Sequence, residues 1–482
     1  MEPRPRQGRN ATPVFVTGSL LRHILVMTST GAAGLVAIFV GDLANIFFLG
    51  LLGDEAVIAA VGYASSVLLL TISIGIGLAI AATALVAPAL GAGHVVKARR
   101  LSTNAHLWTA GVSAVMALGV WLAIPWLLTL LGASGRTHTL AAEYLMILVP
   151  GLPPLALAMT SSAVLRSAGD AKRAMHVTLS GAITNIVLDP IFIFALGLGI
   201  HGAAIASLMS RAVVLAVGLN GVMRVHGLYM RPRRRPFLAD GPRLANVAVP
   251  AILTNVATPF ANAYVTAAMA PFGDSAVAGW AIIGRILPVA FGAIYALSGS
   301  VGPIIGQNYG ARAFDRMRTT LGLALAVTAA FTTVAWLLLI PLAGPLARSF
   351  RASAEATDLI ALFCVWLSPL FVFLGALFVA NAVFNTLGRP HYSTMLNWGR
   401  ATIGTIPFVE IGARWGGAEG VLVANMVGAI VFGTLAIAIG YRLIDWLAEN
   451  GGPPGSGPLR QSKAPEISAQ SAPGLVDGPP SL

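Results

Sequence analysis

The chain has 482 residues, of which 56% are hydrophobic and only 10% are charged. A soluble globular domain carries about 25% charged residues, so this composition excludes a soluble protein and indicates a membrane protein. The net charge of +12 does not indicate a nucleic-acid-binding protein, because the basic residues are concentrated in alternate short loops between apolar segments.

The apolar segments are long enough to cross a bilayer as helices. A run of about 18 or more mainly apolar residues predicts a membrane-spanning helix, and continuous rather than alternating apolar runs exclude a membrane β-barrel. The sequence therefore predicts an all-α polytopic membrane protein with twelve spans. In chain order they cover residues 20–50, 56–87, 103–131, 140–165, 173–197, 201–226, 244–271, 275–304, 318–346, 356–386, 392–413 and 417–446.

The composition outside the spans predicts a division into two lobes with flanking tails. Tails rich in Pro, Gly, Ser or Arg lack the apolar residues needed to form a core, so we expect them to be disordered. The distribution of Lys and Arg predicts that both termini lie in the cytoplasm. The predicted regions are a basic N-terminus (1–19), an N-lobe (20–229), a cytoplasmic basic linker (230–243), a C-lobe (244–447) and a Pro/Gly/Ser-rich tail (448–482).

Short motifs recur in the two halves of the chain at matching places. Gly53-Asp54-Glu55-Ala56-Val57 has a counterpart 220 positions later, in Gly273-Asp274-Ser275-Ala276-Val277, and each copy joins two apolar spans. One span later, each copy is followed by a Pro-x-x-Gly step. A membrane chain duplicated in this way is typical of a secondary transporter, whose site lies between its halves.

Two acids lie deep within apolar sequence in the first half, Asp42 and Asp189. An acid at the bilayer centre costs about 2.5–3.5 kcal/mol on insertion scales, so such acids are functional candidates. Asn185 lies one turn before Asp189 on the same helix face, and Asn45 lies one turn after Asp42. Carboxylate and amide oxygens suit a proton or a small alkali cation. These residues predict an ion-coupling site, and the alternative for each acid is a structural hydrogen bond to a neighbouring helix.

Aromatic and amide side chains within the spans are candidates for a substrate cleft. Aromatic rings can hold a flat, lipophilic cation by stacking and cation–π contact, although packing or interfacial anchoring is the alternative for each residue. The sequence contains no metalloprotease, hydrolase-elbow or Walker A motif, so we expect neither an enzyme nor a bound cofactor. The cleft candidates are Tyr63, Phe260, Asn262, Tyr264, Tyr295 and Asn381.

An ordered set of motifs extends through both halves of the chain. It comprises Leu52–Ala56, Leu90–Gly93, Leu165–Asp170, Asn185–Pro190 and Gly306–Ala311. The set resembles the multidrug and toxic compound extrusion (MATE) family, and the absence of acids in the middle of the seventh and tenth spans resembles its DinF-like branch. The resemblance implies two six-helix lobes around a V-shaped central cleft. It also implies export of organic cations in exchange for protons or sodium ions.

The resemblance further implies a set of ligands for the coupling ion. They are Asn185 and Asp189 on the fifth span, Ser207 on the sixth and an acid on the first. In this chain the position of that acid is occupied by Asn45. Either Asp42 takes its place, or Asp189 carries the coupling alone. If sodium is the coupling ion, the expected ligands are Asp189, Asn185, Asn45 and Ser207.

The sequence therefore predicts a monomeric secondary antiporter of the bacterial inner membrane, without a cofactor or a nucleic-acid partner. It would export lipophilic organic cations in exchange for H⁺ or Na⁺ by alternating access, with Asp189 as the group that is protonated. One alternative is a flippase of lipid-linked saccharides, but Arg211, Arg285 and Arg400 are too scattered to favour a phosphate-lined cleft. A second alternative is a channel or membrane scaffold without coupled transport, which would not need Asp189.

Overall fold

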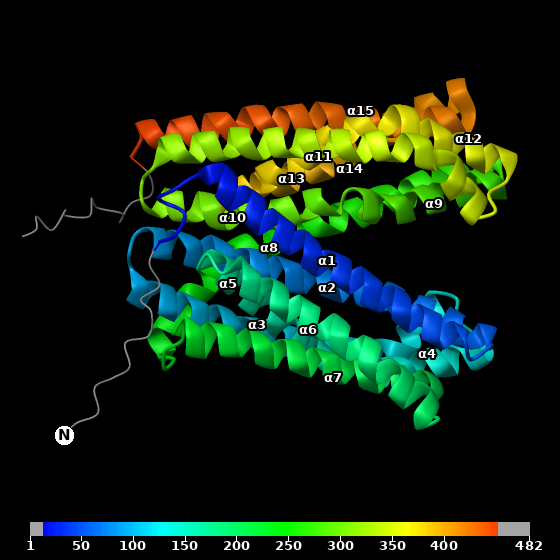
Figure 1. Ribbon diagram of the computed structural model, residues 1–482, viewed down its shortest axis with the longest axis horizontal. Coiled ribbons are helices and arrows are strands. Elements are labelled where there is room, and N and C mark those ends of the chain that lie inside the picture. The colour runs from blue at the N-terminus through cyan, green and yellow to red at the C-terminus, as the bar shows by residue number, and fades with distance from the viewer. Residues whose placement is uncertain (1–12, 452–482) are drawn as a thin grey trace, which may run out of the picture.

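The computed structural model describes residues 13–451, and every regular element in that range is a helix (Figure 1). Most of the two predicted disordered tails lies outside the described residues. The first half forms α1 (Leu20–Gly50), α2 (Glu55–Gly91), α3 (Val95–Leu130), α4 (Gly135–Leu148), α5 (Leu152–Ser167), α6 (Ala171–Pro190) and α7 (Gly199–Asn220). The second half forms α8 (Arg234–Met269), α9 (Asp274–Ala290), α10 (Gly292–Gly310), α11 (Phe314–Ser349), α12 (Ala354–Leu362), α13 (Phe371–Thr386), α14 (Pro390–Ala401) and α15 (Ile406–Glu449).

These helices form the twelve spans that the sequence predicts. Within residues 13–451, ten helical segments are long and apolar enough to cross a membrane, and α9 with α10 adds a span that is bent by 51°. The last of the ten segments has 60 residues, whereas about 20 suffice for one crossing. Its backbone leaves the helical conformation at Gly416 and Gly417. A Cβ on Gly412 would lie 2.3 Å from the Gly420 carbonyl oxygen, so the segment is an antiparallel pair of spans.

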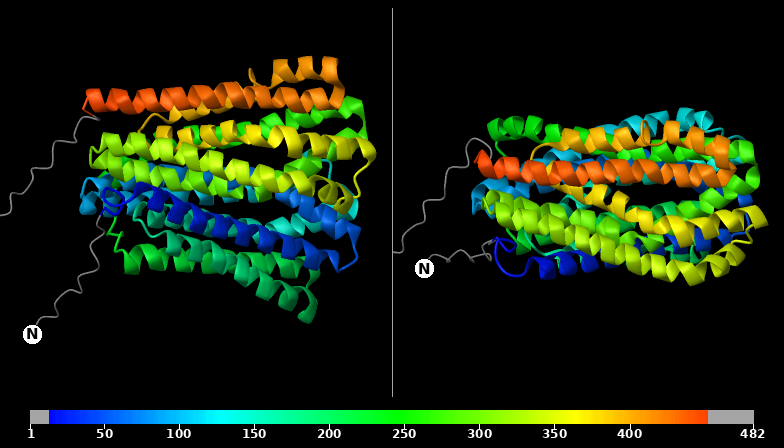
Figure 2. Two further views of the ribbon diagram at one scale, coloured as in Figure 1. Left: turned by 45° about the horizontal axis from the view of Figure 1, so that its top comes forward. Right: turned by 90° about the horizontal axis from the view of Figure 1, so that it is seen from above.

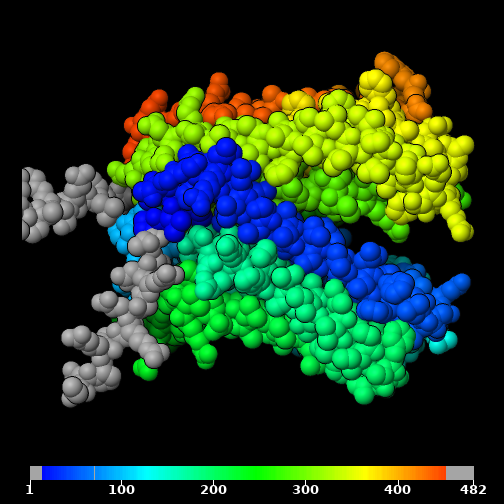
Figure 3. Space-filling view, in the orientation of Figure 1, coloured from blue at the N-terminus to red at the C-terminus, as the bar shows by residue number. Residues whose placement is uncertain are grey.

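The helices are arranged in two lobes, α1–α7 and α8–α15, which lie one above the other in Figure 1 and overlap when the molecule is seen from above (Figure 2, right). Figure 3 shows a groove between the lobes, which opens at the end opposite to the start of α1 and the end of α15. Burial along α2 agrees with this V-shaped cleft. No residue from Thr71 to Ala92 is exposed, whereas Ile58, Gly62 and Ser65 in its first part are exposed.

At the closed end the lobes meet through glycines of α2 and α10. A Cβ on Gly91 would lie 1.9 Å from the Gln307 carbonyl oxygen, and one on Gly310 would lie 2.0 Å from the Pro88 carbonyl oxygen. Such backbone-to-backbone approach is possible only where both helices carry residues without side chains. The Pro-x-x-Gly step at residues 88–91 of α2 therefore packs against the end of the matching step on α10, at Gly306, and against the residues that follow it.

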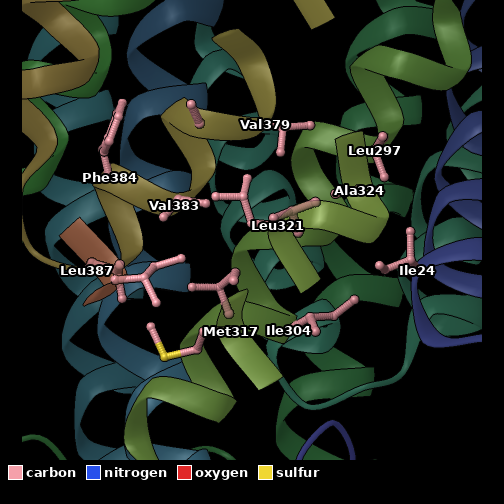
Figure 4. Packing of buried hydrophobic residues seen from close by; sticks show 14 of the residues in the cluster. Ile24, Leu297, Ile304, Met317, Leu321, Ala324, Val379, Val383, Phe384 and Leu387 are labelled. Carbon is pink, nitrogen blue, oxygen red and sulfur yellow. The ribbon is translucent and has the colours of Figure 1, made fainter. Parts of the chain in front are cut away.

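The interior of the C-lobe is packed with aliphatic side chains from several helices (Figure 4). Leu297 of α10, Leu321 of α11 and Val383 of α13 are fully buried in this cluster. Ile24 of α1 joins the same cluster, although α1 begins the other lobe. The lobes therefore share apolar packing in addition to the glycine contact.

Residues 13–18, which we call the N-terminal strap, cross the closed end in front of both lobes. Phe15 is 1% exposed, and its backbone N–H donates to Oε1 of Gln307 at 2.8 Å. Gln307 in turn donates from Nε2 to the Ser167 carbonyl of α5 at 2.7 Å. Arg316 of α11 donates from Nη2 to the Phe15 carbonyl at 2.9 Å. The strap thus connects an N-lobe helix with two C-lobe helices.

The start of α8 lies against the N-lobe. The helix begins at Arg234, ten residues before the predicted span at residue 244. Asp240 is 2% exposed and forms an ion pair with Arg100 of α3, with 3.1 Å between Nε and Oδ2. Asn104 of α3 donates to the same carboxylate at 2.8 Å. The segment between the halves is therefore attached to α3 by a buried charge.

A second acid connects helix ends within the N-lobe at the closed end. Asp170 precedes α6 and accepts a hydrogen bond from the Arg173 backbone N–H at 3.1 Å. Its Oδ2 lies 2.9 Å from Nε2 of His226, and the Arg173 guanidinium pairs with the same oxygen. Burial alone would raise the pKa of Asp170, but the hydrogen bonds from His226 and Arg173 outweigh it and hold that pKa well below its usual range.

Candidate functional site

The N-lobe site is built where α1 packs against α6. Asp189 lies at the end of α6 and has no exposed surface. Asn45 of α1 donates from Nδ2 to Oδ2 of Asp189 at 3.0 Å. The helices come this close because α1 presents Gly34 to Thr178 and Gly41 to Ala182, where an added Cβ would lie 2.5 Å and 3.4 Å from the neighbouring atoms.

Two oxygens of this site have no hydrogen-bond partner among the described residues. They are Oδ1 of Asp189 and Oδ1 of Asn185, and both are buried. The two residues lie one turn apart on α6, so their side chains are neighbours on one face. A buried acceptor without a partner costs about 1–3 kcal/mol. This cost would be relieved by a proton or a small cation bound at these oxygens.

A tyrosine that the sequence did not single out for this site lies near the Asp189 carboxylate, and an arginine lies near that tyrosine. Tyr144 of α4 is 5% exposed, and its hydroxyl is within hydrogen-bonding reach of Ser207 on α7. The charges of Arg211, Asp189 and Asp42 act on the same hydroxyl. Arg211 donates from Nη1 to the Leu148 carbonyl at 2.9 Å. No sequence signal indicated Tyr144, because a tyrosine inside a span is usually a packing residue.

The second candidate acid, Asp42, lies apart from this contact. Its side chain is exposed, and the nearest cation that acts on it is Arg211. Asn45, one turn further along α1, is the residue that reaches Asp189. The structure therefore brings Asn45, Asn185 and Asp189 together, whereas Asp42 is connected to this group only through its charge, which acts on Tyr144 and Arg211.

Three of the predicted cleft residues lie on the part of α8 beyond its contact with α2. Phe260 and Asn262 are exposed, and Tyr264 is half-buried. The Tyr264 hydroxyl donates to Oε1 of Glu410 at 2.6 Å. The ring of Phe260 lies against Trp398 of α14, with 5.3 Å between ring centroids.

The other three lie on α2, α10 and α13. Tyr63 is half-buried against the N-lobe core. Tyr295 is 38% exposed. Asn381 is 9% exposed, and its Oδ1 accepts from Nδ2 of Asn397 on α14 at 3.0 Å. Asn381 is thus bound within the C-lobe, whereas Tyr295 has a free face.

The C-lobe contains a buried cation, Arg400 of α14. Its side chain is 6% exposed, and Nη2 donates to Oγ1 of Thr258 on α8 at 3.3 Å. Its Nε has no hydrogen-bond partner within residues 13–451. Among the described residues, the titratable group whose charge acts on it is the Tyr295 hydroxyl rather than a carboxylate. Asn397 and Ser393 continue the same face of α14 as buried polar residues.

Comparison with known proteins identifies the family. The MatE family model matches residues 32–191 and 250–409, which is more than half of the chain. The chain belongs to the MATE family. The model matches once in each half, and this explains the recurring motifs. MATE proteins are membrane transporters, so this protein is a transporter and not an enzyme.

Individual MATE proteins resemble the chain over nearly their whole length. The FAD transporter of Shewanella oneidensis is 30% identical over 434 residues, which cover 88% of this chain and 95% of that protein. The multidrug export protein MepA of Staphylococcus haemolyticus is 22% identical over 432 residues, with coverages of 89% and 95%. The solved structure of the Vibrio cholerae MATE transporter VcmN in its bent form superposes with a TM-score of 0.84 at 26% identity, covering 90% and 99% of the two chains.

Proposed function

We propose that this MATE protein is an antiporter in which Asp189 binds the coupling ion, H⁺ or Na⁺, and an organic solute is exported in exchange. The observation that carries the proposal is the state of this carboxylate. It is completely buried, one of its oxygens is held by Asn45, and the other has no partner among the described residues. A buried charge with one free oxygen is a site that gains by binding a cation.

The charge of Asp189 couples ion binding to the shape of the N-lobe. When the carboxylate is ionised, Nδ2 of Asn45 stabilises it across the boundary of α1 and α6. A bound proton or sodium ion removes the net charge and weakens that hydrogen bond, so α1 and α6 can repack. Because Gly34 and Gly41 carry no side chains of their own at this boundary, a small shift of α1 against Thr178 and Ala182 of α6 is sterically possible. If the ion is Na⁺, its ligands are Asp189, Asn185, Asn45 and Ser207.

The transport cycle then consists of rocking of the lobes, residues 20–229 and 244–447, about their contact. The closed end carries the basic residues Arg99, Arg173 and Arg389, so the positive-inside rule places it in the cytoplasm with both termini. The open cleft faces the outside of a bacterial inner membrane, and the functional unit is the monomer. Moving one charge through roughly 100 mV supplies about 2.3 kcal/mol, which supports a roughly fifty-fold solute gradient.

The test is transport by purified protein in vesicles, with proton and sodium gradients imposed separately. Asp189→Asn keeps the size of the side chain but cannot change its charge, so we expect ion-driven exchange to be lost while solute binding remains. Asp42→Asn is the matched control, because Asp42 has no hydrogen bond to Asp189 within residues 13–451, and we expect its loss to leave coupling intact. Ion-driven exchange at the wild-type rate in Asp189→Asn would reject the proposal.

The relatives support two classes of solute. Lipophilic organic cations are suggested by the name of MepA, a multidrug export protein. A flavin nucleotide is the second candidate, because the FAD transporter shares 30% identity over 88% of the chain and because the C-lobe carries a buried cation without a carboxylate partner. Exchange of ethidium and of FAD, measured in the same vesicles, discriminates the two classes.

A further inference from the structure

We propose that the C-lobe contains a binding site for an anionic group of the exported solute, a phosphate or a carboxylate, with Arg400 as the residue that binds it. This inference rests on the proposed export function and assigns the solute class. Arg400 is 6% exposed, and among the described residues its guanidinium has one hydrogen bond, to Thr258. Arg100 provides a contrast, because it lies at another helix boundary and is paired with the buried Asp240.

An unpaired buried charge is strongly unfavourable, and its replacement by an uncharged residue often stabilises a protein. A helix bundle that retains such a charge gains from it only if another partner compensates it. No carboxylate within residues 13–451 pairs with the guanidinium of Arg400. The compensating anion is therefore one that arrives with the solute.

The position of Arg400 along the cleft makes it accessible to a solute. On α8, the contact with Gly77 of α2 is made at Ile252, and Thr258 lies six residues further toward the open end. On α10, the contact with α2 is made at Gly302, and Tyr295 lies seven residues further in the same direction. Arg400 lies between Thr258 and Tyr295, just beyond the point where the C-lobe leaves α2. Arg400 itself is 6% exposed, whereas Tyr295, whose hydroxyl charge acts on it, is 38% exposed, so a solute can reach the residue next to the guanidinium.

The surrounding groups define the chemistry of the ligand. A guanidinium donates two parallel hydrogen bonds to a phosphate or carboxylate, and the hydroxyls of Thr258 and Tyr295 lie beside it as further polar partners. Aromatic rings are close by, since Tyr295 contacts Phe378 with 5.3 Å between ring centroids. The site therefore fits an amphipathic anion, in which a flat ring system carries a phosphate or carboxylate group.

A pair of probes that differ in one phosphate tests this assignment. Riboflavin 5′-phosphate and riboflavin share the same ring, and their binding to the purified protein is measured by quenching of flavin fluorescence. We expect the wild type to prefer the phosphorylated probe. Arg400→Gln should weaken binding of that probe by about tenfold to a hundredfold, the loss expected for a hydrogen-bonded charge. Its affinity for riboflavin should not change.

Arg285→Gln is the matched control, because Arg285 is an exposed arginine within the α9 span, and we expect it to leave both affinities unchanged. Arg400→Gln should unfold at the same temperature as the wild type or higher, since it removes an uncompensated charge. Equal affinity of the wild type for the two probes would overturn the proposal. A clear loss of thermal stability in Arg400→Gln would also overturn it, because it would assign a structural role to the arginine.

The outcome is separable from that of the antiport proposal. Asp189→Asn should retain the preference for the phosphorylated probe and lose only ion-driven exchange. If Arg400→Gln retains the preference while Asp189→Asn loses exchange, the anion site is wrong and the antiport mechanism stands. If Arg400→Gln loses the preference while Asp189→Asn keeps ion-driven exchange, the coupling site is wrong and the anion site stands.

Discussion

The contact at the closed end predicts that Gly91→Ala shifts the protein away from the conformation with the open outer cleft. The added Cβ would lie 1.9 Å from the Gln307 carbonyl oxygen, whereas ordinary contact begins at 3.4 Å. The two backbones must therefore separate by about 1.5 Å. Backbone atoms of packed helices cannot rotate away as a flexible side chain can, so the strain acts on the contact between the lobes.

The size of the shift follows from two opposing terms. Overpacking of this kind costs about 1–3 kcal/mol. Replacing Gly by Ala within a helix recovers up to about 1 kcal/mol, in every conformation of the lobes. Only the overpacking cost differs between the conformation in which the closed-end contact is made and the one in which it is broken. A difference of 1–2 kcal/mol changes the ratio of these two conformations by about fivefold to thirtyfold.

Cysteine labelling measures this ratio. The chain has one cysteine, Cys364, so Cys364→Ser provides a cysteine-free background. In that background Thr83→Cys places a thiol on α2 beside Gly302, where the closed end shields it. We expect Gly91→Ala to increase the rate at which a maleimide labels this thiol. Gly62→Ala on the same helix is the control, because nothing lies within 4 Å of its added Cβ. Folded Gly91→Ala protein with wild-type labelling and transport would refute the reasoning.

Two further predictions concern the acids at the closed end. Asp240→Ala should lower the free energy of unfolding by about 1.5–3 kcal/mol, since it removes the buried acceptor of Arg100 and Asn104, and thermal denaturation of the purified protein measures the loss. Asp170→Asn should cost about 2 kcal/mol at neutral pH, where the wild-type carboxylate is ionised and bonded to His226 and Arg173. Because its pKa is lower in the folded than in the unfolded state, this contribution is lost as the pH falls below about 4. The difference in Tm between wild type and Asp170→Asn should therefore shrink in acid, and a difference that is independent of pH would contradict the assignment.

The N-lobe site was partly predictable from the sequence. Asp189 and Asn185 were visible because acids and amides are rare in apolar spans and because they share one helix face. Asn45 is 144 positions before Asp189, and their hydrogen bond depends on how α1 crosses α6. The sequence singled out Asp42 as an acid and, through the family resemblance, Asn45 as the position of the first-span ligand, and in the structure it is Asn45 that donates to the carboxylate.

In the C-lobe the sequence was less informative. Arg400 was visible as a charged residue in an apolar span, but the property that makes it a candidate is the lack of a carboxylate partner. Whether a carboxylate lies within reach of Arg400 depends on all the helices that pack around it, and the sequence near Arg400 does not contain this information. The spans themselves were predictable from hydropathy, because their length is set by the bilayer. The N-terminal strap was not predictable, because its attachment depends on hydrogen bonds between the Phe15 backbone and the distant residues Gln307 and Arg316.

In the proposed transport cycle, the N-terminal strap adds hydrogen bonds that must break when the cleft opens to the inside but not when it opens to the outside. With the cleft open at the opposite end, as in the structure, Gln307 is bonded to both Phe15 and Ser167. Opening at the inside must part Gln307 from Ser167, and Phe15 must then leave one lobe or the other. The slow step of a cycle built in this way would be the return to the inward-facing state, and its rate would depend on six residues that contact neither ion nor solute.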